Sequence, residues 1–195
     1  TSRPAHQAGM MVTPYLVDDL LIDSGFAHAR AQMMSFLAGR PLRAVACTHH
    51  HEDHAGNAGV LAERHGCPVY LHHPEVQWDE GVRGLVLYRS LFWGAPAPYC
   101  PEAMPERLDT ARRTLLAVPA PGHSASHVVF FDPAAGHAFV GDLFMNSGAS
   151  AVLWYENPYE SIRSLRRVAA LEPALLLSGH GLVLEQPAPS LRRKA

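Results

Sequence analysis

Residues 48–54 of the chain are Thr-His-His-His-Glu-Asp-His, and within them His49, His51, Asp53 and His54 form the pattern His-x-His-x-Asp-His. Imidazole nitrogen and carboxylate oxygen are the ligand atoms that suit zinc, iron or manganese. Packing alone does not require four such side chains within six positions. The stretch therefore predicts a metal site, and we expect the chemistry to take place there.

Three shorter motifs lie further along the chain. Like the first motif, which follows a predicted strand at 43–48, each of them comes after a predicted strand. His123 lies in Pro-Gly-His after strand 114–118, Asp142 lies in Gly-Asp after strand 138–140, and His180 lies in Gly-His after strand 174–178. Loops at the ends of strands converge in α/β proteins. We therefore expect His123, Asp142 and His180 to join the first motif in one site.

The pattern of apolar and turn residues predicts short strands and helices that alternate along the chain. Strands are predicted at 13–17, 20–23, 43–48, 68–72, 114–118, 128–131, 138–140 and 174–178, and helices at 27–38, 57–65 and 157–171. Asn157 is a favourable helix cap, and Pro158 suits the first helical position. Such alternation indicates an α/β architecture.

A segment of different composition covers about residues 75–109. It is rich in proline and also contains Trp78, Tyr88, Phe92, Trp93 and Tyr99. We expect part helix and part irregular loop, lying near the active site. Two interpretations stay open: the aromatic residues form an apolar wall that selects the substrate, or they form a small peripheral core or a homodimer contact.

Composition limits the classes of protein that fit. The chain has 195 residues, enough for one domain over 1–195, with 48% hydrophobic and 17% charged residues. The formal net charge is −2 and no basic run precedes Arg192-Arg193-Lys194, so no nucleic-acid partner is expected. No apolar run is long enough to span a membrane. Three cysteines suggest reduced thiols in a cytoplasmic protein.

The motifs together carry a family resemblance. His49-x-His51-x-Asp53-His54, followed in order by His123, Asp142 and His180, is similar to the pattern of the metallo-β-lactamase superfamily of hydrolases. Leu21-Ile22-Asp23-Ser24-Gly25 resembles an early strand and turn of that family. The resemblance covers about residues 13–184. It implies an α/β fold of a single domain, the four-layer αβ/βα sandwich of that superfamily, with two metals at one edge.

The resemblance also implies a ligand set. His49, His51 and His123 would hold one metal ion, Asp53, His54 and His180 would hold the second, and Asp142 would bridge both. Two zinc ions are expected, with iron or manganese as alternatives. The metals would share a hydroxide that acts as the nucleophile. Asp53 would orient that hydroxide and carry a proton to the leaving group.

The stretch from Pro121 to His127 resembles the glyoxalase II-like branch of the family. His127 either lines the pocket and binds the substrate or is a packed histidine that supports the ligands. No lysine precedes Lys194, so the lysine substrate anchors of glyoxalase II and of classical β-lactamases have no counterpart in the body of the chain.

The expected activity is a zinc-dependent hydrolase for a small ester, thioester or lactone. Alternatives are a mononuclear iron persulfide dioxygenase, or β-lactamase or phosphodiesterase activity on the same fold. A metal-binding domain without catalysis is a further alternative, but the complete ligand set argues against it.

Overall fold

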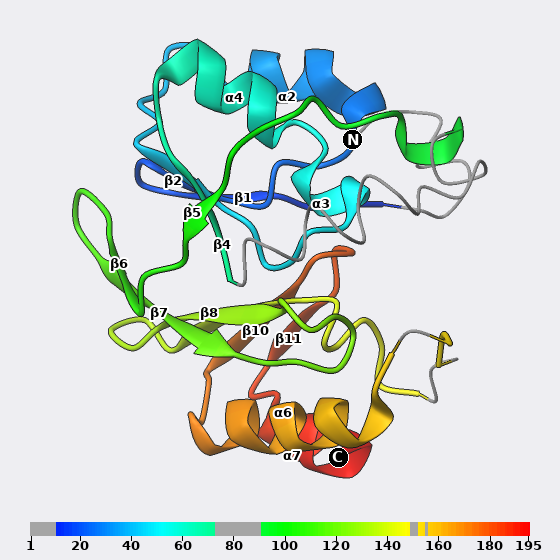
Figure 1. Cartoon of the computed structure of the whole chain (residues 1–195). Coiled ribbons are helices and arrows are strands. Elements are labelled where there is room, and N and C mark those ends of the chain that lie inside the picture. The colour runs from blue at the N-terminus through cyan, green and yellow to red at the C-terminus, as the bar shows by residue number, and fades with distance from the viewer. Residues whose placement is uncertain (1–10, 73–90, 149–151, 155) are drawn as a thin grey trace. The chain divides into compact units, whose positions relative to one another are not determined.

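The computed structural model describes residues 11–72, 91–148, 152–154 and 156–195 (Figure 1). By its internal contacts the chain divides into two compact units, Thr1–Met104 and Pro105–Ala195. Each unit contains one sheet and its own hydrophobic core, and each is described separately below.

The first unit contains a five-stranded sheet in the order β1-β2-β3-β4-β5. Its strands are β1 (Tyr15–Val17), β2 (Leu20–Ile22), β3 (Ala44–Ala46), β4 (Val69–Leu71) and β5 (Glu102–Ala103). β1 and β2 form an antiparallel hairpin, whereas β2 to β5 pair in parallel. β2 and β3 are buried at every position, as expected for parallel strands that are covered on both faces.

The helices of the first unit that lie wholly within its described residues include η1 (Ala27–Ala29), α2 (Arg30–Leu37), α3 (Glu52–Ala55) and α4 (Ala58–His65). In Figure 1, α2 and α4 lie side by side on one face of the sheet, where Leu37 and Leu61 join Val45 and Val69 in the core. α4 ends at Gly66, whose left-handed backbone (φ 61°) is the conformation that a glycine helix stop provides.

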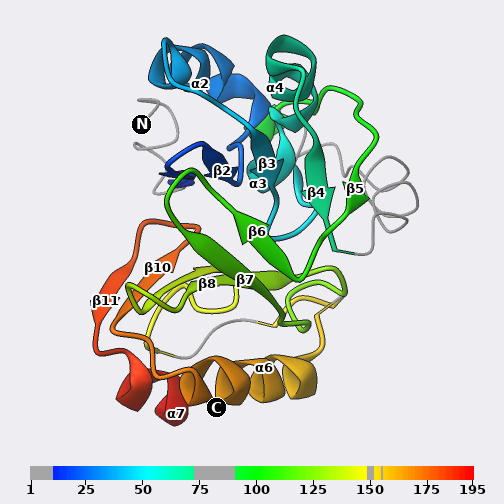
Figure 2. The same ribbon diagram turned by 90° about the vertical axis from the view of Figure 1, so that its left-hand side faces the viewer.

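The second unit contains a six-stranded sheet in the order β11-β10-β9-β8-β7-β6 (Figure 2). Its strands are β6 (Arg107–Asp109), β7 (Thr114–Pro119), β8 (Val128–Asp132), β9 (His137–Gly141), β10 (Leu175–Ser178) and β11 (Val183–Glu185). Only the β9–β10 pair is parallel among these neighbours. Because the chain leaves β9 and β10 at the same end, the loops carrying Asp142 and His180 are neighbours.

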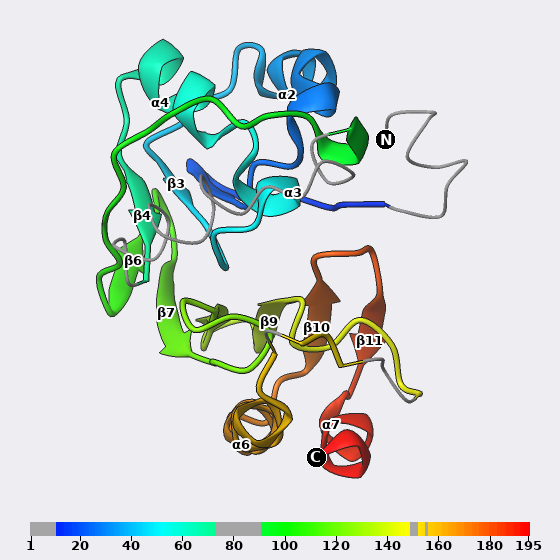
Figure 3. The same ribbon diagram turned by 45° about the vertical axis from the view of Figure 1, so that its right-hand side comes forward.

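Two helices, α6 (Pro158–Ala170) and α7 (Ala188–Lys194), cover one face of the second sheet (Figure 3). Leu165 and Val168 of α6 and Leu191 of α7 pack with Val140 and Leu176 of the strands. Asn157 caps α6, since its side-chain oxygen accepts hydrogen bonds from the backbone N–H groups of residues 159 and 160. The helix start predicted at Asn157-Pro158 is therefore confirmed.

Five elements differ from the sequence-based expectation. β5 and β6 lie in the segment expected to be helix and loop, and α3, β11 and α7 were not predicted at all. Strands of two or three residues leave little periodicity to detect. Trp78 and Tyr88 lie outside the described residues, whereas the Trp93 ring packs edge-on against Phe26 at 5.2 Å. That contact gives Trp93 a packing role within the first unit.

The state of the cysteines and the character of the helices can be described for the residues that the structure covers. Cys47, Cys67 and Cys100 all carry free thiols. Within the described ranges, none of the helices combines the length and the apolar character that crossing a membrane requires.

One buried carboxylate connects the turns of the second sheet. Asp132 at the end of β8 is 2% exposed and pairs with Arg113 Nη1 at 2.6 Å. Its Oδ1 also accepts hydrogen bonds from the backbone N–H groups of Ala134 and Ala135. Desolvation would raise the pKa of Asp132, but the hydrogen bonds and the guanidinium charge outweigh it, so the pKa is lowered.

Replacing Asp132 by Asn is expected to cost about 1–2 kcal/mol of unfolding free energy at neutral pH, because the charge-assisted bond to Arg113 is lost. A carboxyl whose pKa is lower in the folded state than in the unfolded state stabilises the fold at pH values above its unfolded-state pKa of about 3.9. This stabilisation is lost as the pH falls through the folded-state pKa. Urea unfolding of both proteins should therefore show a difference that is largest near neutrality and shrinks in acid. Glu106→Gln, at an exposed side chain, is the control. An equal loss at acidic and neutral pH would contradict this account.

Candidate metal centre

In the first unit, the histidine-rich motif begins just after β3 and runs into the short helix α3. Asp23, at the end of the neighbouring β2, fixes its start. Asp23 Oδ1 accepts hydrogen bonds from the backbone N–H of Thr48 (2.7 Å) and from the Thr48 hydroxyl (3.1 Å). Asp23 is 2% exposed, so these bonds form where water does not compete.

A chain of hydrogen bonds sets the tautomer of His49. The Thr48 hydroxyl donates to the Asp23 carboxylate at 2.9 Å, so its oxygen is left to accept from His49 Nδ1 at 3.0 Å. Assigning the proton to Nδ1 makes Nε2 the nitrogen that carries the lone pair. His49 is fully buried, and its metal-binding atom is thus fixed by the partner on its other nitrogen.

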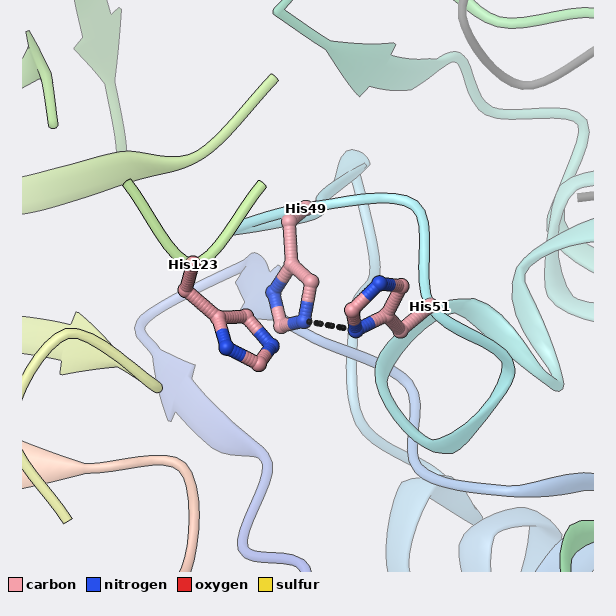
Figure 4. A group of neighbouring side chains, drawn as sticks. All are labelled: His49, His51 and His123. Atoms are coloured by element: carbon pink, nitrogen blue, oxygen red, sulfur yellow. Dashed lines mark hydrogen bonds between the residues drawn. The ribbon is translucent and has the colours of Figure 1, made fainter. Parts of the chain in front are cut away.

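His51 points its Nδ1 at the Nε2 of His49, with 3.0 Å between the two nitrogens (Figure 4). Two ligand atoms on one tetrahedral zinc ion lie roughly 3.3 Å apart, given Zn–N distances of about 2.0–2.1 Å. The spacing of His49 and His51 is close to that value, so the pair fits one shared metal ion.

His54 and Asp53 occupy the next turn of the motif. His54 Nδ1 donates to Asp23 Oδ2 at 2.8 Å, because a carboxylate only accepts, and Nε2 therefore carries the lone pair. That Nε2 lies 3.7 Å from Asp53 Oδ2. Asp23 thus holds two of the predicted ligands, His54 directly and His49 through Thr48.

In the second unit, the loop that carries His123 is held by α6 and the residues just before it. The carbonyl oxygens of Pro119, Pro121 and Gly122 accept hydrogen bonds from Arg167, Ser164 and the backbone N–H of Asn157, respectively. Gly122 lies against the first turn of α6, where a Cβ atom would come within 2.5 Å of the Ser161 nitrogen. Only glycine fits this close approach.

Glu156 orients the ring of His123. Its Oε1 accepts a hydrogen bond from His123 Nδ1 at 2.6 Å, and its Oε2 accepts one from the backbone N–H of Leu153 at 2.8 Å. Desolvation would raise the pKa of Glu156, but these hydrogen bonds outweigh it and the pKa is lowered. A carboxylate partner on Nδ1 leaves His123 Nε2 as the ligand atom.

Asp142 lies between two histidines of its own unit. Its Oδ2 is 3.5 Å from His123 Nε2 and 3.2 Å from His180 Nε2. The backbone N–H of Gly179 donates to the carbonyl oxygen of Gly141 at 2.8 Å, which connects the loops after β10 and β9. The carboxylate thus faces both histidines, as a bridging ligand would.

His127 is fully buried, and its Nε2 accepts a hydrogen bond from the backbone N–H of Asp142 at 3.2 Å. This contact corresponds to the interpretation of His127 as a packed histidine that supports the ligands. The substrate-binding role expected from the sequence stays a prediction.

Each unit contributes side chains whose donor atoms suit a divalent metal. The first contributes His49, His51, Asp53 and His54, and the second contributes His123, Asp142 and His180. Within each unit, neighbouring donor atoms are 3.0–3.7 Å apart, near the roughly 3.3 Å expected on a common zinc ion. The chemistry and spacing of the donors therefore fit a metal.

Asp23 and Glu156 were not predicted as site residues. For Asp23 a signal existed, because a carboxylate directly after a buried strand has the same strand-end position as the ligands. For Glu156 the sequence offered none, since its neighbours indicate only the start of a helix.

Replacing Gly122 by Ala should cost about 1–3 kcal/mol more than replacing Gly39, because only the first change forces a Cβ into α6. Gly39 also has a positive φ (71°), but a Cβ there meets nothing within 4 Å. Urea unfolding of the two variants measures the difference. Equal losses would mean that the loop before His123 is not packed as described.

The comparisons with known proteins agree with this donor pattern. A family model described as the metallo-beta-lactamase superfamily matches residues 9–180, which reach into both units. The protein TTHA1623, solved in a di-iron-bound form, matches with a TM-score of 0.72 and 27% identity over 91% of each chain.

Two similar curated enzymes are 30% identical to the chain. Atrochrysone carboxyl ACP thioesterase of Aspergillus fumigatus matches over 85% of this chain and 48% of its own length. Hydroxyacylglutathione hydrolase of Fuscovulum blasticum matches over 79% of this chain and 55% of its own length. The chain thus spans about half the length of these two enzymes. The expected resemblance is confirmed: the chain belongs to the metallo-beta-lactamase superfamily and has its α/β sandwich fold.

Proposed function

We propose that the protein is a dinuclear zinc hydrolase that cleaves a small ester, thioester or lactone. The proposal builds on membership of a hydrolase superfamily and on a His/Asp donor set that implies a metal cofactor. The observation that carries it is the position of Asp142 Oδ2, which faces both His123 and His180. A carboxylate at ligand spacing from two histidines can bridge two metal ions, one bound by each histidine.

We further propose that the two units form one catalytic domain and that their donors serve one centre. His49, His51 and His123 would hold the first ion, Asp53, His54 and His180 the second, and Asp142 both. Support comes from the single family match that reaches into both units, and from the order of the motifs, which resembles that of the family.

Bound zinc would lower the pKa of a water molecule towards neutrality and would polarise the scissile carbonyl. Two carboxylates of the chain fix the tautomers of proposed ligand histidines. Asp23 and Glu156 hold the protons of His54 and His123 on Nδ1, so that Nε2 is directed to the ligand position. Asp53 is proposed to orient the attacking water and to carry its proton to the leaving group.

The substrate class is supported by the names of the relatives. A thioesterase and a hydroxyacylglutathione hydrolase are each 30% identical to this chain. Both names refer to acyl compounds of small-molecule or carrier type, which favours a thioester over a phosphodiester. The free thiols of Cys47, Cys67 and Cys100 support the proposal of a cytoplasmic, reducing compartment.

Iron is the alternative to zinc, because the relative TTHA1623 was solved with two iron ions. Imidazole and carboxylate ligands accept either metal. One iron ion per chain would instead favour the dioxygenase alternative, with an oxygen-consumption assay as its test.

Replacing His123 or Asp142 by Ala should lower the metal content from about two ions per chain and reduce hydrolysis at least about a hundredfold, because each variant lacks a direct ligand. Elemental analysis and a panel of esters, thioesters and lactones measure the two effects. His137→Ala, at the start of β9 in the same unit, is the matched control. A fully metallated and fully active Asp142→Ala protein would refute the assignment.

Replacing Glu156 by Gln should weaken metal binding roughly 10- to 100-fold, since the charged partner of His123 Nδ1 becomes neutral. Competition with a chromogenic chelator gives the affinity, and circular dichroism checks that the fold is kept. Glu160→Gln, at a carboxylate that pairs with Arg163 on the first turn of α6, is the control. If both variants bind metal like the wild type, Glu156 does not orient a ligand.

A further inference from the structure

A cavity of about 480 Å³ lies within the second unit, beside two of the proposed ligands. Small-molecule sites commonly have volumes of about 300–1,000 Å³, so the cavity has the size of a ligand site. His123 and Asp142 form one part of its wall. The rest of its lining includes the apolar side chains of Leu143, Met145, Val152, Ile162 and Leu165. A group held at the two ligands would therefore have an apolar space directly beside it.

Helix α6 supplies one side of this cavity. The residues that line it follow the spacing i, i+3, i+4 and i+7, which places them on one side of the helix: Pro158, Ser161, Ile162 and Leu165. Ser161 lies against Gly122, where an added Cβ would come within 2.5 Å of the Ser161 nitrogen. Because His123 directly follows Gly122, the apolar side of α6 begins next to a proposed ligand.

The loop after β9 supplies another side, and the last helix holds this loop in place. Met145 of the loop lines the cavity. Its neighbour Asn146 accepts hydrogen bonds from Lys194 Nζ, through the backbone carbonyl oxygen at 2.6 Å and through Oδ1 at 3.4 Å. The Lys194 ammonium also lies 5.1 Å from the centre of the Phe144 ring. Lys194 thus contacts the residues on both sides of Met145 and supports the wall that Met145 forms.

Several apolar side chains of the wall are only partly covered by the protein itself. Met145 and Ile162 are partly exposed, and Val152 is 57% exposed. An apolar chain that entered the cavity would remove this apolar surface from water, which is favourable. A charged group against the same side chains would instead lose part of its hydration. The wall therefore favours an uncharged apolar occupant.

We propose that the substrate carries an uncharged alkyl chain on its scissile ester or thioester bond, and that this chain binds in the cavity lined by helix α6 and the loop after β9. The inference rests on the proposed function, because it places the scissile bond at His123 and Asp142. Met145 and Ile162 are then specificity-determining residues, which contact the chain and set the length that the cavity accepts.

The first test measures kcat/KM on the metal-loaded protein for p-nitrophenyl esters whose acyl chain grows from acetate to decanoate. Each methylene that is buried should raise kcat/KM roughly fourfold until the cavity is full. A parallel series of S-alkyl thioacetates shows whether the chain belongs to the acyl group or to the leaving group. Values of kcat/KM that do not depend on chain length in either series would overturn the proposal.

A charged occupant is the competing interpretation, because Arg193 and Lys194 also line the cavity. The mono-p-nitrophenyl ester of adipic acid has an acyl chain as long as hexanoate, but ends in a carboxylate. The wild type should cleave the hexanoate ester with the higher kcat/KM. Faster cleavage of the adipate ester would overturn the proposal of an uncharged chain.

Two substitutions of Ile162 should move the preferred chain length in opposite directions. Ile162→Phe fills part of the cavity, so it should move the maximum to shorter chains and lower the octanoate-to-acetate ratio of kcat/KM about tenfold. Ile162→Ala enlarges the cavity and should move the maximum to longer chains. Ala170→Phe adds the same ring at an exposed position of α6 and should leave the preference unchanged. Circular dichroism and elemental analysis check fold and metal content. An unchanged preference in both Ile162 variants would contradict the assignment.

A binding measurement separates this inference from the proposed function. Calorimetry with neutral amides from acetamide to octanamide gives the affinity for the chain without turnover. An affinity that rises roughly fourfold per methylene, with a smaller rise in Ile162→Phe, supports the cavity assignment even if no ester is cleaved, a result that would count against the hydrolase alone. Ester cleavage together with amide affinities that do not depend on chain length would overturn the alkyl site and leave the hydrolase standing.

Discussion

The hydrogen bonds that carboxylates accept from ligand histidines are the constraint on which the candidate site depends. A histidine can bind metal only through a nitrogen that carries no proton, so the other nitrogen must hold it. Asp23 holds that proton on His54 directly and on His49 through Thr48, and Glu156 does the same for His123. Asp23 directly follows β2, and Glu156 lies just before the first residue of α6, so these two elements position the carboxylates. Burial of Asp23 strengthens the effect, because no water competes for its oxygens.

The parts of the fold that the sequence predicted are those with a strong local pattern. Asn157-Pro158 indicated the start of α6, and Gly66 indicated the end of α4, because capping depends on adjacent residues. The proposed ligand residues stand out in the sequence because histidine and aspartate follow predicted strands. β5, β11 and α7 were missed because each is short and is stabilised by its neighbours in space. Glu156 was missed for a related reason: its role depends on a contact with a residue 33 positions away.

Function in this superfamily depends on what surrounds the metal, since one fold supports many reactions. In this chain, the cavity of the second unit is lined by apolar side chains and by Arg193 and Lys194 of α7. The sequence has no lysine before Lys194, so the lysine anchors of glyoxalase II and of classical β-lactamases have no counterpart in its body. Lys194 itself lines the cavity of the second unit, from the last helix.

The central claim is that donors from both units hold two metal ions in one centre. Anomalous X-ray diffraction from crystals of the metal-loaded protein, collected at the zinc and iron absorption edges, tests it most directly. We expect two anomalous peaks about 3.5–4 Å apart, the spacing of two-metal sites, with Asp142 contacting both. A single peak, or metal held by His49 and His51 without His123, Asp142 or His180, would contradict the account.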